Sequence, residues 1–369
     1  MSGPATMLFA GGGTGGHIYP NIAVLEQLRW LDVDLPAHFL LSDRPLDERI
    51  AAEQRLRFTA LPAKPFSSRP WQWPGFLYNW HRAVRDAVAL LKQLNAAVVV
   101  GTGGFITAPA IAAARKCGLP SALVNLDAVP GRANRYVARR ATQRFTVYPH
   151  RSLGDARRIG LPLRADAIGP PRREAACRSL GLDPVSEILL IVGGSSGARS
   201  INRMMARLVQ QPEVRTALRS WQVLHLCGPE DRDTLSEAYT GAGIAARVEP
   251  SIRQMGAAWA AASCAISRAG AGAVAEAWAN GCPTIFLPYP FHRDQHQKLN
   301  AAPLIEQGGA VLVEDPVKPD PAARSVAPVL LGLMTDAPRR QHMREALASS
   351  RPPEGAKLVA EWVSRQLDV

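Results

Sequence analysis

One glycine-rich stretch near the start of the chain constrains the fold more than any other feature. It reads Gly11-Gly12-Gly13-Thr14-Gly15-Gly16-His17 and lies between the apolar residues 6–10 and the apolar-periodic residues 22–28. This order predicts a buried strand, a sharp loop and a helix. Glycine lets the backbone turn sharply and approach a ligand, and a helix N-terminus offers N–H groups to an anion. We therefore predict a phosphate or diphosphate site, with the titratable His17 at its end.

The same pattern recurs along the chain. Further buried strands are expected at residues 37–41, 96–100, 121–125, 188–192, 222–226, 264–267 and 284–287. Glycine loops follow two of them, at residues 101–105 and 193–199. Strands that alternate with helices predict an α/β chain with parallel sheets, and ligands bind such sheets at the carboxyl ends of the strands. Because the pattern pauses near residues 168–173 and then restarts, we expect two successive α/β halves.

Length and charge limit the classes of protein to which this sequence can belong. The 369 residues favour two domains, and the chain has no run of about 18 apolar residues that would predict a transmembrane helix. The N-terminus lacks the pattern of a signal peptide, so we expect a cytoplasmic protein. A formal charge of +12 favours an anionic partner, but no nucleic-acid-binding motif accompanies it. The five scattered cysteines suit buried thiols, and no metal-ligand spacing is present.

Aromatic residues cluster beside arginines in residues 69–85. The cluster comprises Trp71, Trp73, Phe76, Leu77 and Trp80. Aromatic and basic side chains together are typical of a surface that rests on an anionic membrane. A locally packed aromatic cluster would use the same residues, and the sequence leaves both interpretations open.

Two segments of the second half carry polar side chains just after expected strands. Glu276 lies in the first turns of a helix that follows a small-residue loop. A carboxylate at that place can accept hydrogen bonds from both hydroxyls of a ribose. Residues 287–301 gather amides and imidazoles in a loop and a helix start, which suits a hydroxylated ligand such as a sugar.

Taken in order, residues 11–17, 101–105, 193–199, 268–276 and 294–300 resemble the motifs of the family-28 glycosyltransferases that add N-acetylglucosamine to undecaprenyl-diphospho-muramoyl-pentapeptide. The resemblance covers nearly the whole chain. It implies an α/β GT-B fold, with two Rossmann-like parallel-sheet domains facing a cleft and a C-terminal helix returning to the first domain. We place an acceptor and membrane-side domain at residues 1–168, a donor domain at 169–347, and the C-terminal helix at 348–369.

The resemblance also implies roles for single residues. In the second domain it places the uracil of UDP-N-acetylglucosamine at Ile252, the ribose at Glu276, the diphosphate near Arg173 and Ser195, and the sugar at His296 and Gln297. The remaining donor contacts implied are Ala271, Gly272, Ala273, Val274 and Ala275, together with Thr14, Gly15, Gly16 and Asp127 from the first domain. The loops assigned to the acceptor diphosphate contain Gly13, Gly103, Gly104 and Phe105.

Four departures from the family pattern are present, two in each half, and the one that removes the acidic residue of the family lies in the acceptor half. Val124-Asn125-Leu126-Asp127 stands where the family usually reads His-Glu-Gln-Asn, and Phe105 stands in place of a tyrosine. Pro170-Pro171-Arg172-Arg173 stands where the family usually reads Asn-Pro-Val-Arg, and His296 replaces a glutamine. The donor half therefore keeps the family motifs better than the acceptor half.

These observations predict an inverting sugar transfer from UDP to a lipid-diphosphate sugar, at the cytoplasmic face of the cell membrane. The acceptor hydroxyl must lose a proton, so His17 is the first candidate base and Asp127 the second. Arg173, Ser195 and helix N–H groups can stabilise the leaving UDP, so neither a metal nor a cofactor is expected. Three alternatives remain: a transferase for another acceptor, a binder of UDP-sugar or lipid diphosphate without catalysis, and a nicotinamide dehydrogenase.

Overall fold

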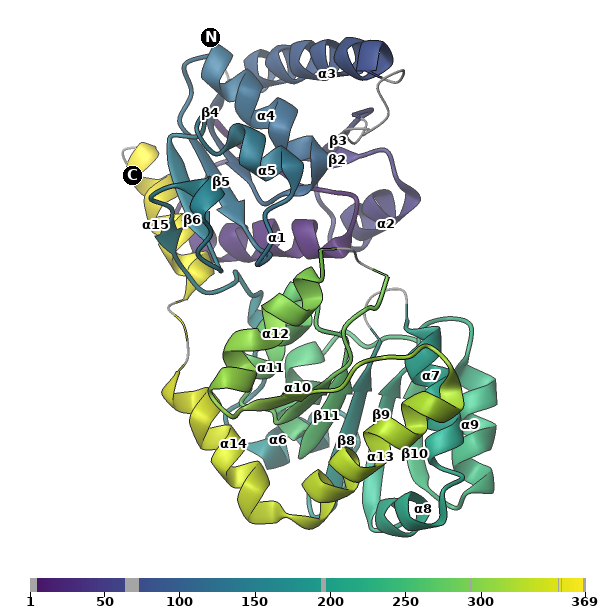
Figure 1. Ribbon diagram of the computed structural model, residues 1–369. Helices are drawn as coiled ribbons and strands as arrows, with labels where there is room; N and C mark the ends of the chain where they lie inside the picture. The colour runs from purple at the N-terminus through teal and green to yellow at the C-terminus, as the bar shows by residue number, and fades with distance from the viewer. Residues whose placement is uncertain are drawn as a thin grey trace. The chain divides into compact units, whose positions relative to one another are not determined.

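The computed structural model describes residues 5–63, 73–193, 197–291, 294–350, 352 and 354–367 (Figure 1). Contacts divide the chain into a first unit, Met1–Arg164 with Pro352–Val369, and a second unit, Ala165–Arg351. We predicted boundaries after residues 168 and 347, whereas the units divide after residues 164 and 351. The side chain of Asn280 explains the first difference, because it donates to the carbonyl of Ala167 and accepts from the N–H of Gly169.

The described strands of the first unit form one parallel sheet in the order β3-β2-β1-β4-β5-β6-β7. The strands are β1 (Thr6–Ala10), β2 (Ala37–Ser42), β3 (Phe58–Leu61), β4 (Ala96–Gly101), β5 (Ser121–Asn125), β6 (Gln143–Thr146) and β7 (Arg157–Arg158). The helices are α1 (Gly15–Trp30), α2 (Pro45–Glu53), α3 (Trp73–Gln93), α4 (Gly104–Lys116) and α5 (Arg132–Val137), with a 3₁₀ turn at Arg151–Leu153. The strand order reverses between β1 and β4, so the first two glycine loops flank the point where such sheets bind ligands.

The second unit repeats this arrangement in the order β10-β9-β8-β11-β12-β13, again parallel. Its strands are β8 (Glu187–Val192), β9 (Trp221–Leu226), β10 (Ala245–Glu249), β11 (Cys264–Ser267), β12 (Thr284–Phe286) and β13 (Ala310–Leu312). Its helices are α6 (Arg173–Ser179), α7 (Arg199–Leu208), α8 (Pro212–Leu218), α9 (Arg232–Gly241), α10 (Met255–Ala261), α11 (Ala271–Ala279), α12 (His296–Glu306), α13 (Pro319–Thr335) and α14 (Ala337–Ser349), and a 3₁₀ turn, Ala165–Ala167, precedes them. The order reverses between β8 and β11, which matches the reversal in the first sheet.

Central strands are apolar along their whole length because helices cover both faces of each sheet. Strand β8 illustrates this. Leu189 and Ile191 pack into one core cluster with residues of α7 and α13, whereas Leu190 packs into a second cluster with residues of α10 and α11. Successive side chains of a strand point to opposite faces, so one strand contributes to both clusters.

The C-terminal helix α15 (Gly355–Gln366) belongs to the first unit and packs against α1. The indole of Trp362 meets the ring of Phe145 edge to face, with the ring centres 6.4 Å apart. Two parallel-sheet units and a returning C-terminal helix confirm the fold class predicted from the sequence. No helix in the described part of the chain combines the length and the apolar character needed to cross a membrane.

Candidate active site

The first glycine loop is anchored by a carboxylate that the sequence did not single out. Asp47, on α2, is fully buried, and its Oδ2 accepts from the N–H of Gly13 at 2.7 Å and from the N–H and hydroxyl of Ser42 at 3.0 and 2.5 Å. Gly13 has a φ of +89°, a conformation that glycine adopts without strain. The loop that starts α1 is therefore tied to the end of β2.

His17 lies in the first turn of α1, where its side chain is half-buried. Its Nδ1 is 3.2 Å from the carbonyl oxygen of Thr102. A carbonyl can only accept, so the neutral ring carries its proton on Nδ1 and leaves Nε2 as the basic nitrogen. Burial lowers the pKa of His17 below its usual 6.5, although the carboxylate of Asp127 acts in the opposite direction.

The backbone of the second glycine loop packs against the imidazole of His17. Gly103 has a φ of +116°, and a Cβ there would stand 2.9 Å from Nδ1 of His17, so the contact requires a glycine. Phe105, one residue into α4, lies under the guanidinium of Arg44, whose carbon is 5.4 Å from the ring centre. Arg44 also donates to the carbonyl of Gly13 at 3.0 Å, which joins the two glycine loops.

Asp127 follows β5 at the same carboxyl edge of the first sheet. The buried amide of Asn125 fixes the turn that carries it, by donating to the carbonyl of Asp127 at 2.8 Å and accepting from Asn134 at 3.1 Å. The charge of Asp127 acts to raise the pKa of His17, and both predicted bases lie at the carboxyl edge of the first sheet. Thr14 and Gly16 are exposed at the start of α1, whereas Gly15 is buried.

A cavity of about 430 Å³ adjoins these loops in the first unit. Its lining residues come from the ends of β2 and β3, from α3 and from the start of α4, and they are Asp43, Arg44, Pro62, Ala63, Asn79, Arg82 and Phe105. The lining contains two guanidinium groups and one carboxylate, so the cavity is suited to an anionic or strongly polar group.

In the second unit, α11 presents the predicted ribose ligand. Gly270 precedes the helix, Ala271 begins it, and Glu276 follows in the second turn with a half-buried side chain. The Oε2 of Glu276 accepts from the indole N–H of Trp259 at 2.8 Å. The side chain of Val274 faces the core and is buried there, so this residue can meet a ligand only through its backbone.

The other donor residues follow the carboxyl ends of two strands of the same sheet, β10 and β12, which are not adjacent. Ile252 follows β10 and is half-buried. Gln297 lies in the first turn of α12 and accepts from the N–H of Tyr289 through Oε1 at 2.9 Å. Nδ1 of His296 is 2.8 Å from the carboxylate of Asp294, so this imidazole is oriented by an acid.

A buried ion pair supports this edge of the second sheet. Arg268, at the end of β11, lies 2.8 Å from the carboxylate of Asp315 and donates to the carbonyl of Leu287 at 2.9 Å. Ser200, in the first turns of α7, donates to the same carboxylate at 2.8 Å. The segments that follow β8, β11, β12 and β13 are thus joined through one guanidinium, which makes this edge of the unit rigid.

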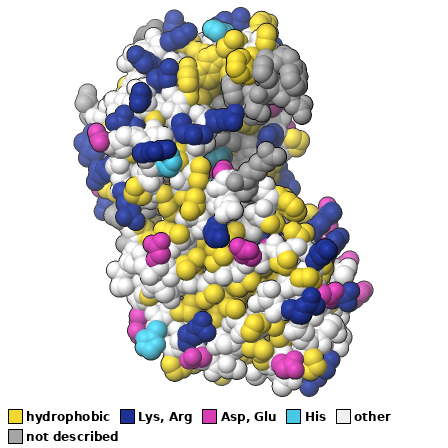
Figure 2. All heavy atoms as spheres, viewed as in Figure 1, with side chains coloured by type: hydrophobic (Ala, Val, Ile, Leu, Met, Phe, Trp, Pro, Cys, Tyr) yellow, Lys and Arg dark blue, Asp and Glu magenta, His cyan; other side chains and the backbone are white. Residues whose placement is uncertain are grey.

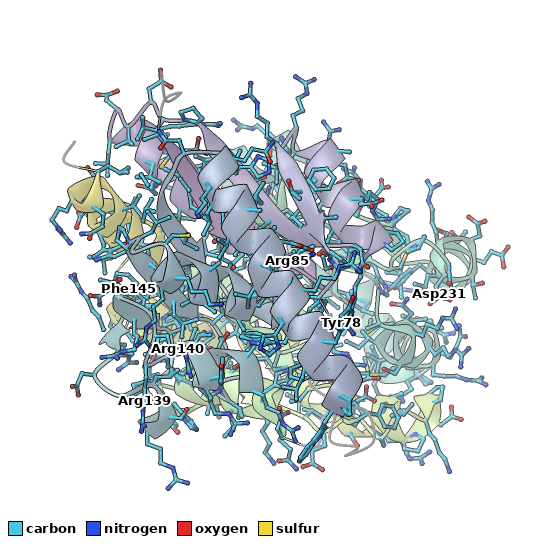
Figure 3. The ribbon with its side chains drawn as sticks, turned by 90° about the horizontal axis from the view of Figure 1, so that it is seen from above. Tyr78, Arg85, Arg139, Arg140, Phe145 and Asp231 are labelled. Atoms are coloured by element: carbon cyan, nitrogen blue, oxygen red, sulfur yellow. The ribbon has the colours of Figure 1, made fainter. Side chains whose placement is uncertain are left out.

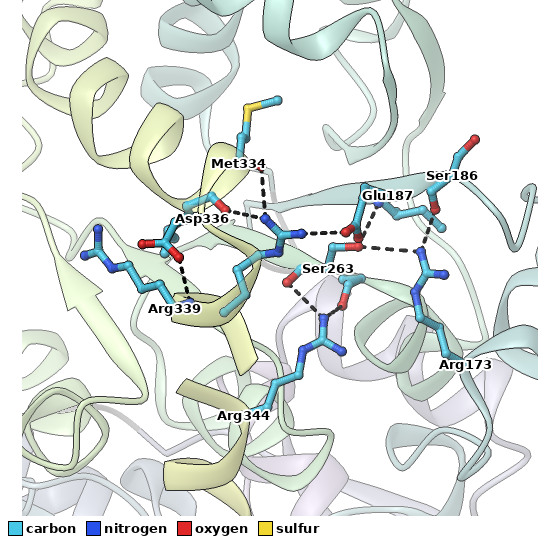
Figure 4. A network of polar contacts seen from close by, with 12 residues as sticks. Arg173, Ser186, Glu187, Ser263, Met334, Asp336, Arg339 and Arg344 are labelled. Atoms are coloured by element: carbon cyan, nitrogen blue, oxygen red, sulfur yellow. Dashed lines mark hydrogen bonds and ion pairs between the residues drawn. The ribbon is translucent and has the colours of Figure 1, made fainter. Parts of the chain in front are cut away.

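The prediction that Arg173 lies near the donor diphosphate is wrong. Its guanidinium donates to the carbonyls of Ala261 at 3.0 Å and Pro184 at 2.8 Å. It also donates to the carbonyl of Ser186 at 2.6 Å (Figure 4). These residues precede β11 and β8, so Arg173 lies at the amino edge of the sheet, opposite the glycine loop. These hydrogen bonds satisfy backbone carbonyl groups that would otherwise lack a donor.

Another arginine fits the expected spacing from a proline. Arg164 follows Pro162 by two positions, as Arg173 follows Pro171, and its guanidinium lies 4.3 Å from the centre of the Tyr19 ring in α1. This places a positive charge beside the first turns of α1. The Pro-x-Arg spacing includes Arg164, but that spacing occurs six times in the sequence and therefore does not by itself identify one arginine.

Arg340, which lies in the same polar network as Arg173, is expected to stabilise the second unit. Arg340 is buried, pairs with Glu187 and donates to the carbonyls of Leu333 and Met334 at the end of α13. Burial alone would raise the pKa of Glu187, but hydrogen bonds from Ser263 and Arg340 and the guanidinium charge outweigh it and lower that pKa.

We expect Arg340→Met to destabilise the second unit by about 2–3 kcal/mol, because it leaves two carbonyls and a carboxylate without their partner. The melting temperature should fall by roughly 5–10 °C. Arg339→Met, one residue away and exposed, is the control and should change little. The difference should shrink as the pH falls through the lowered pKa of Glu187, since protonation removes the ion pair from the parent and from Arg339→Met, whereas Arg340→Met has no such pair to lose. Equal melting temperatures at neutral pH would contradict this.

The predicted membrane patch lies at the start of α3. Trp73 is 47% exposed and Leu77 52%, whereas Phe76 and Trp80 are half-buried. Trp80 packs edge to face on Tyr136 of the α5 helix, 5.4 Å between ring centres. Figure 2 shows hydrophobic and basic side chains side by side over this end of the first unit. Two predicted site residues, Trp71 and Ser195, lie outside the described residues.

Known proteins match this chain over nearly its whole length. A model of the glycosyltransferase family 28 N-terminal domain matches residues 7–146, and a model of the C-terminal domain of that family matches residues 188–359. The chain is 35% identical over 364 residues to the UDP-N-acetylglucosamine–N-acetylmuramyl-(pentapeptide) pyrophosphoryl-undecaprenol N-acetylglucosamine transferase of Clavibacter sepedonicus, covering 96% of this chain and 95% of the relative. The protein of the same name from Frankia casuarinae is 32% identical over 367 residues, covering 97% and 95%.

Solved structures show the same fold at lower identity. The crystal structure of Acinetobacter baumannii MurG is similar with a TM-score of 0.77 and 23% identity, covering 98% of this chain and all of the other. The calicheamicin glycosyltransferase CalG4 is similar with a TM-score of 0.65 and 16% identity, covering 100% of this chain and 99% of the other. At these identities the structures establish the fold alone.

Proposed function

The chain belongs to glycosyltransferase family 28, and on this premise we propose that it transfers N-acetylglucosamine from UDP-N-acetylglucosamine to the muramoyl sugar of the undecaprenyl-diphosphate precursor of peptidoglycan. The reaction inverts the anomeric carbon and serves cell-wall synthesis. The observation that carries the proposal is the carboxyl edge of the second sheet, where Ile252 follows the edge strand β10, and Glu276 and Gln297 lie in the helices that follow the adjacent strands β11 and β12.

The donor binds the second unit in this proposal. The backbone of Ile252 holds the uracil, the carboxylate of Glu276 accepts the ribose hydroxyls, and Gln297 reads the sugar. The amide of Gln297 is oriented by the N–H of Tyr289, which bonds its oxygen and so directs its NH₂ group as a donor. With Arg173 at the other edge, helix N–H groups at α7 and α11 remain to stabilise the leaving diphosphate.

The acceptor binds the first unit. The hydroxyl of the muramoyl sugar attacks the anomeric carbon while Nε2 of His17 takes its proton, and the C–O bond to UDP breaks with its electron pair going to the diphosphate. The lowered pKa of His17 keeps the imidazole neutral at neutral pH, which a base requires. The cavity lined by Arg44 and Arg82 lies beside this loop and accommodates an anionic part of the acceptor.

Product formation from purified protein tests the proposal. UDP-N-acetylglucosamine and the lipid-linked muramoyl-pentapeptide should give UDP and the disaccharide lipid, detected by mass spectrometry. UDP binding without product from this acceptor would favour a family member with another acceptor or a binder without catalysis. Binding of NADH in place of UDP would favour a dehydrogenase and overturn the proposal.

Glu276→Ala should weaken UDP binding by about 10- to 100-fold, because two charge-assisted hydrogen bonds to the ribose are lost. Isothermal titration calorimetry measures the effect directly. Glu306→Ala, at the last residue of α12, removes a carboxylate elsewhere in the same unit and serves as the control. Unchanged UDP affinity in the Glu276 variant would contradict its role.

We further propose that the protein is peripheral, with α3 resting on an anionic membrane surface. Trp73, Leu77 and Tyr78 are exposed on this helix, and basic residues accompany them (Figure 3 labels Tyr78, Arg85, Arg139 and Arg140). Exposed aromatic groups enter the interface between headgroups and acyl chains, while arginines bind the phosphates.

Replacing both Trp73 and Leu77 with alanine should weaken binding to anionic vesicles by about tenfold or more, since burying each side chain is worth about 1.5–3 kcal/mol. Flotation with vesicles that contain phosphatidylglycerol measures this. The double variant of Trp30 and Leu31, an exposed pair of the same residue types at the end of α1, is the matched control. Equal flotation of the two double variants would count against this surface.

A further inference from the structure

A fully buried tryptophan touches the carboxylate to which we assign the ribose. Trp259 on α10 is 0% exposed, and its indole N–H is 2.8 Å from Oε2 of Glu276 on α11. The ring itself packs in the core cluster between the sheet and these helices. An indole has a single hydrogen-bond donor, and here that donor is given to a charged group rather than to a backbone carbonyl.

The contact restricts the conformations of the glutamate side chain before its carboxylate binds a diol. A glutamate side chain has several rotatable bonds, and only some of its conformations direct the carboxylate toward two adjacent hydroxyls. A hydrogen bond from a rigid, buried ring fixes one carboxylate oxygen in place before the ligand arrives. Preorganisation of this kind raises affinity by reducing the entropy that is lost on binding.

We propose that Trp259 is a positioning residue for the nucleotide: its indole N–H holds the Glu276 carboxylate in the orientation that accepts the ribose hydroxyls of UDP. This inference rests on the proposed donor function of the second unit. Neighbouring Trp278 provides the contrast, because it is also buried and its indole N–H donates to the backbone carbonyl of Leu347 at 3.1 Å. Both tryptophans donate one hydrogen bond through the indole N–H, but of the two only Trp259 donates it to Glu276, the residue to which we assign the ribose.

Calorimetry with two nucleotides tests the proposal. Trp259→Phe removes the donor and keeps an aromatic ring, so UDP affinity should fall about 3- to 10-fold, the usual range for one hydrogen bond. Affinity for 2′,3′-dideoxy-UDP, which lacks both hydroxyls, should be the same in the variant and the parent. Trp259→Tyr carries a hydroxyl donor on a similar ring and should recover part of the UDP affinity.

Trp278→Phe is the matched control, since it removes a buried indole from α11 without touching Glu276 and should leave the affinity for both nucleotides unchanged. In a Glu276→Ala background, Trp259→Phe should have no further effect on UDP binding. Equal losses for UDP and its dideoxy analogue, in either Trp259 variant that folds, would show a purely structural role and overturn the inference. Normal UDP affinity in Trp259→Phe would overturn it while leaving the donor site intact. Absence of UDP binding by the parent protein would overturn the proposed function as well.

Discussion

Replacing His17 with alanine is expected to lower the turnover of sugar transfer by about 10²–10⁴-fold, the usual contribution of a general base. The hydrogen bond from Nδ1 to the carbonyl of Thr102 fixes the ring and leaves Nε2 as the nitrogen that takes the proton. UDP binds the second unit in our proposal, so its affinity should not change. Initial rates of UDP release measure turnover, and calorimetry measures the affinity.

His38→Ala is the control for this experiment. His38 is a half-buried histidine of the same sheet, and its Nε2 is 2.9 Å from the hydroxyl of Thr59. Its loss should leave turnover close to that of the parent. If the His17 variant also keeps near-normal turnover, the base is another group, and Asp127 at the same edge is the next to test.

The pH dependence of the parent enzyme follows from the environment of His17. Burial, the dominant effect, lowers its pKa below 6.5, while Asp127 opposes this in part. An imidazole can take a proton only when it is neutral, so activity falls as the pH drops through the lowered pKa of His17. We therefore expect kcat/KM to be maintained down to about pH 6.5, with the acid limb below that value. An acid limb well above pH 6.5 would argue against His17.

The central strands could be predicted from sequence because they are long apolar runs. β1, β5 and β8 are buried along nearly all of their length, and their expected positions agree with the structure. The edge strands β3, β7, β10 and β13 and the inner strand β6 were not predicted. Three residues of β10 are exposed, so it has no apolar run, and its pairing with β9 is what makes it a strand.

The sequence singles out candidate residues where they lie in a glycine loop or in the first turns of the helix that follows a strand and its loop. His17 and Glu276 satisfy this condition. The groups that orient them do not, because Asp47 and Trp259 lie on helices distant in sequence and meet their partners only in the folded unit. The assignment of Arg173 to the donor diphosphate rested on local spacing, which does not tell which edge of a sheet an arginine occupies.

Asp47 carries the second of the two largest effects that we expect. Asp47→Ala leaves the buried N–H groups of Gly13 and Ser42 without an acceptor, which should cost about 2–4 kcal/mol of stability. The freed loop also carries His17, and a displacement of about 1 Å at a reacting group can cost about 10²-fold in rate. Denaturant unfolding and turnover measure the two effects. Glu48→Ala, the next residue on α2 and exposed, is the control.

Asp47→Asn separates the geometry of the anchor from its charge. The amide oxygen can accept the same N–H groups, so the plateau of turnover should be largely restored. The negative charge that raises the pKa of His17 is removed, however, so that pKa should fall further. The acid limb of kcat/KM should then move to lower pH than in the parent. An Asn variant as inactive as the Ala variant would show that the charge, rather than the position of the loop, is what the reaction requires. Normal turnover in Asp47→Ala would show that the glycine loop holds His17 without this anchor.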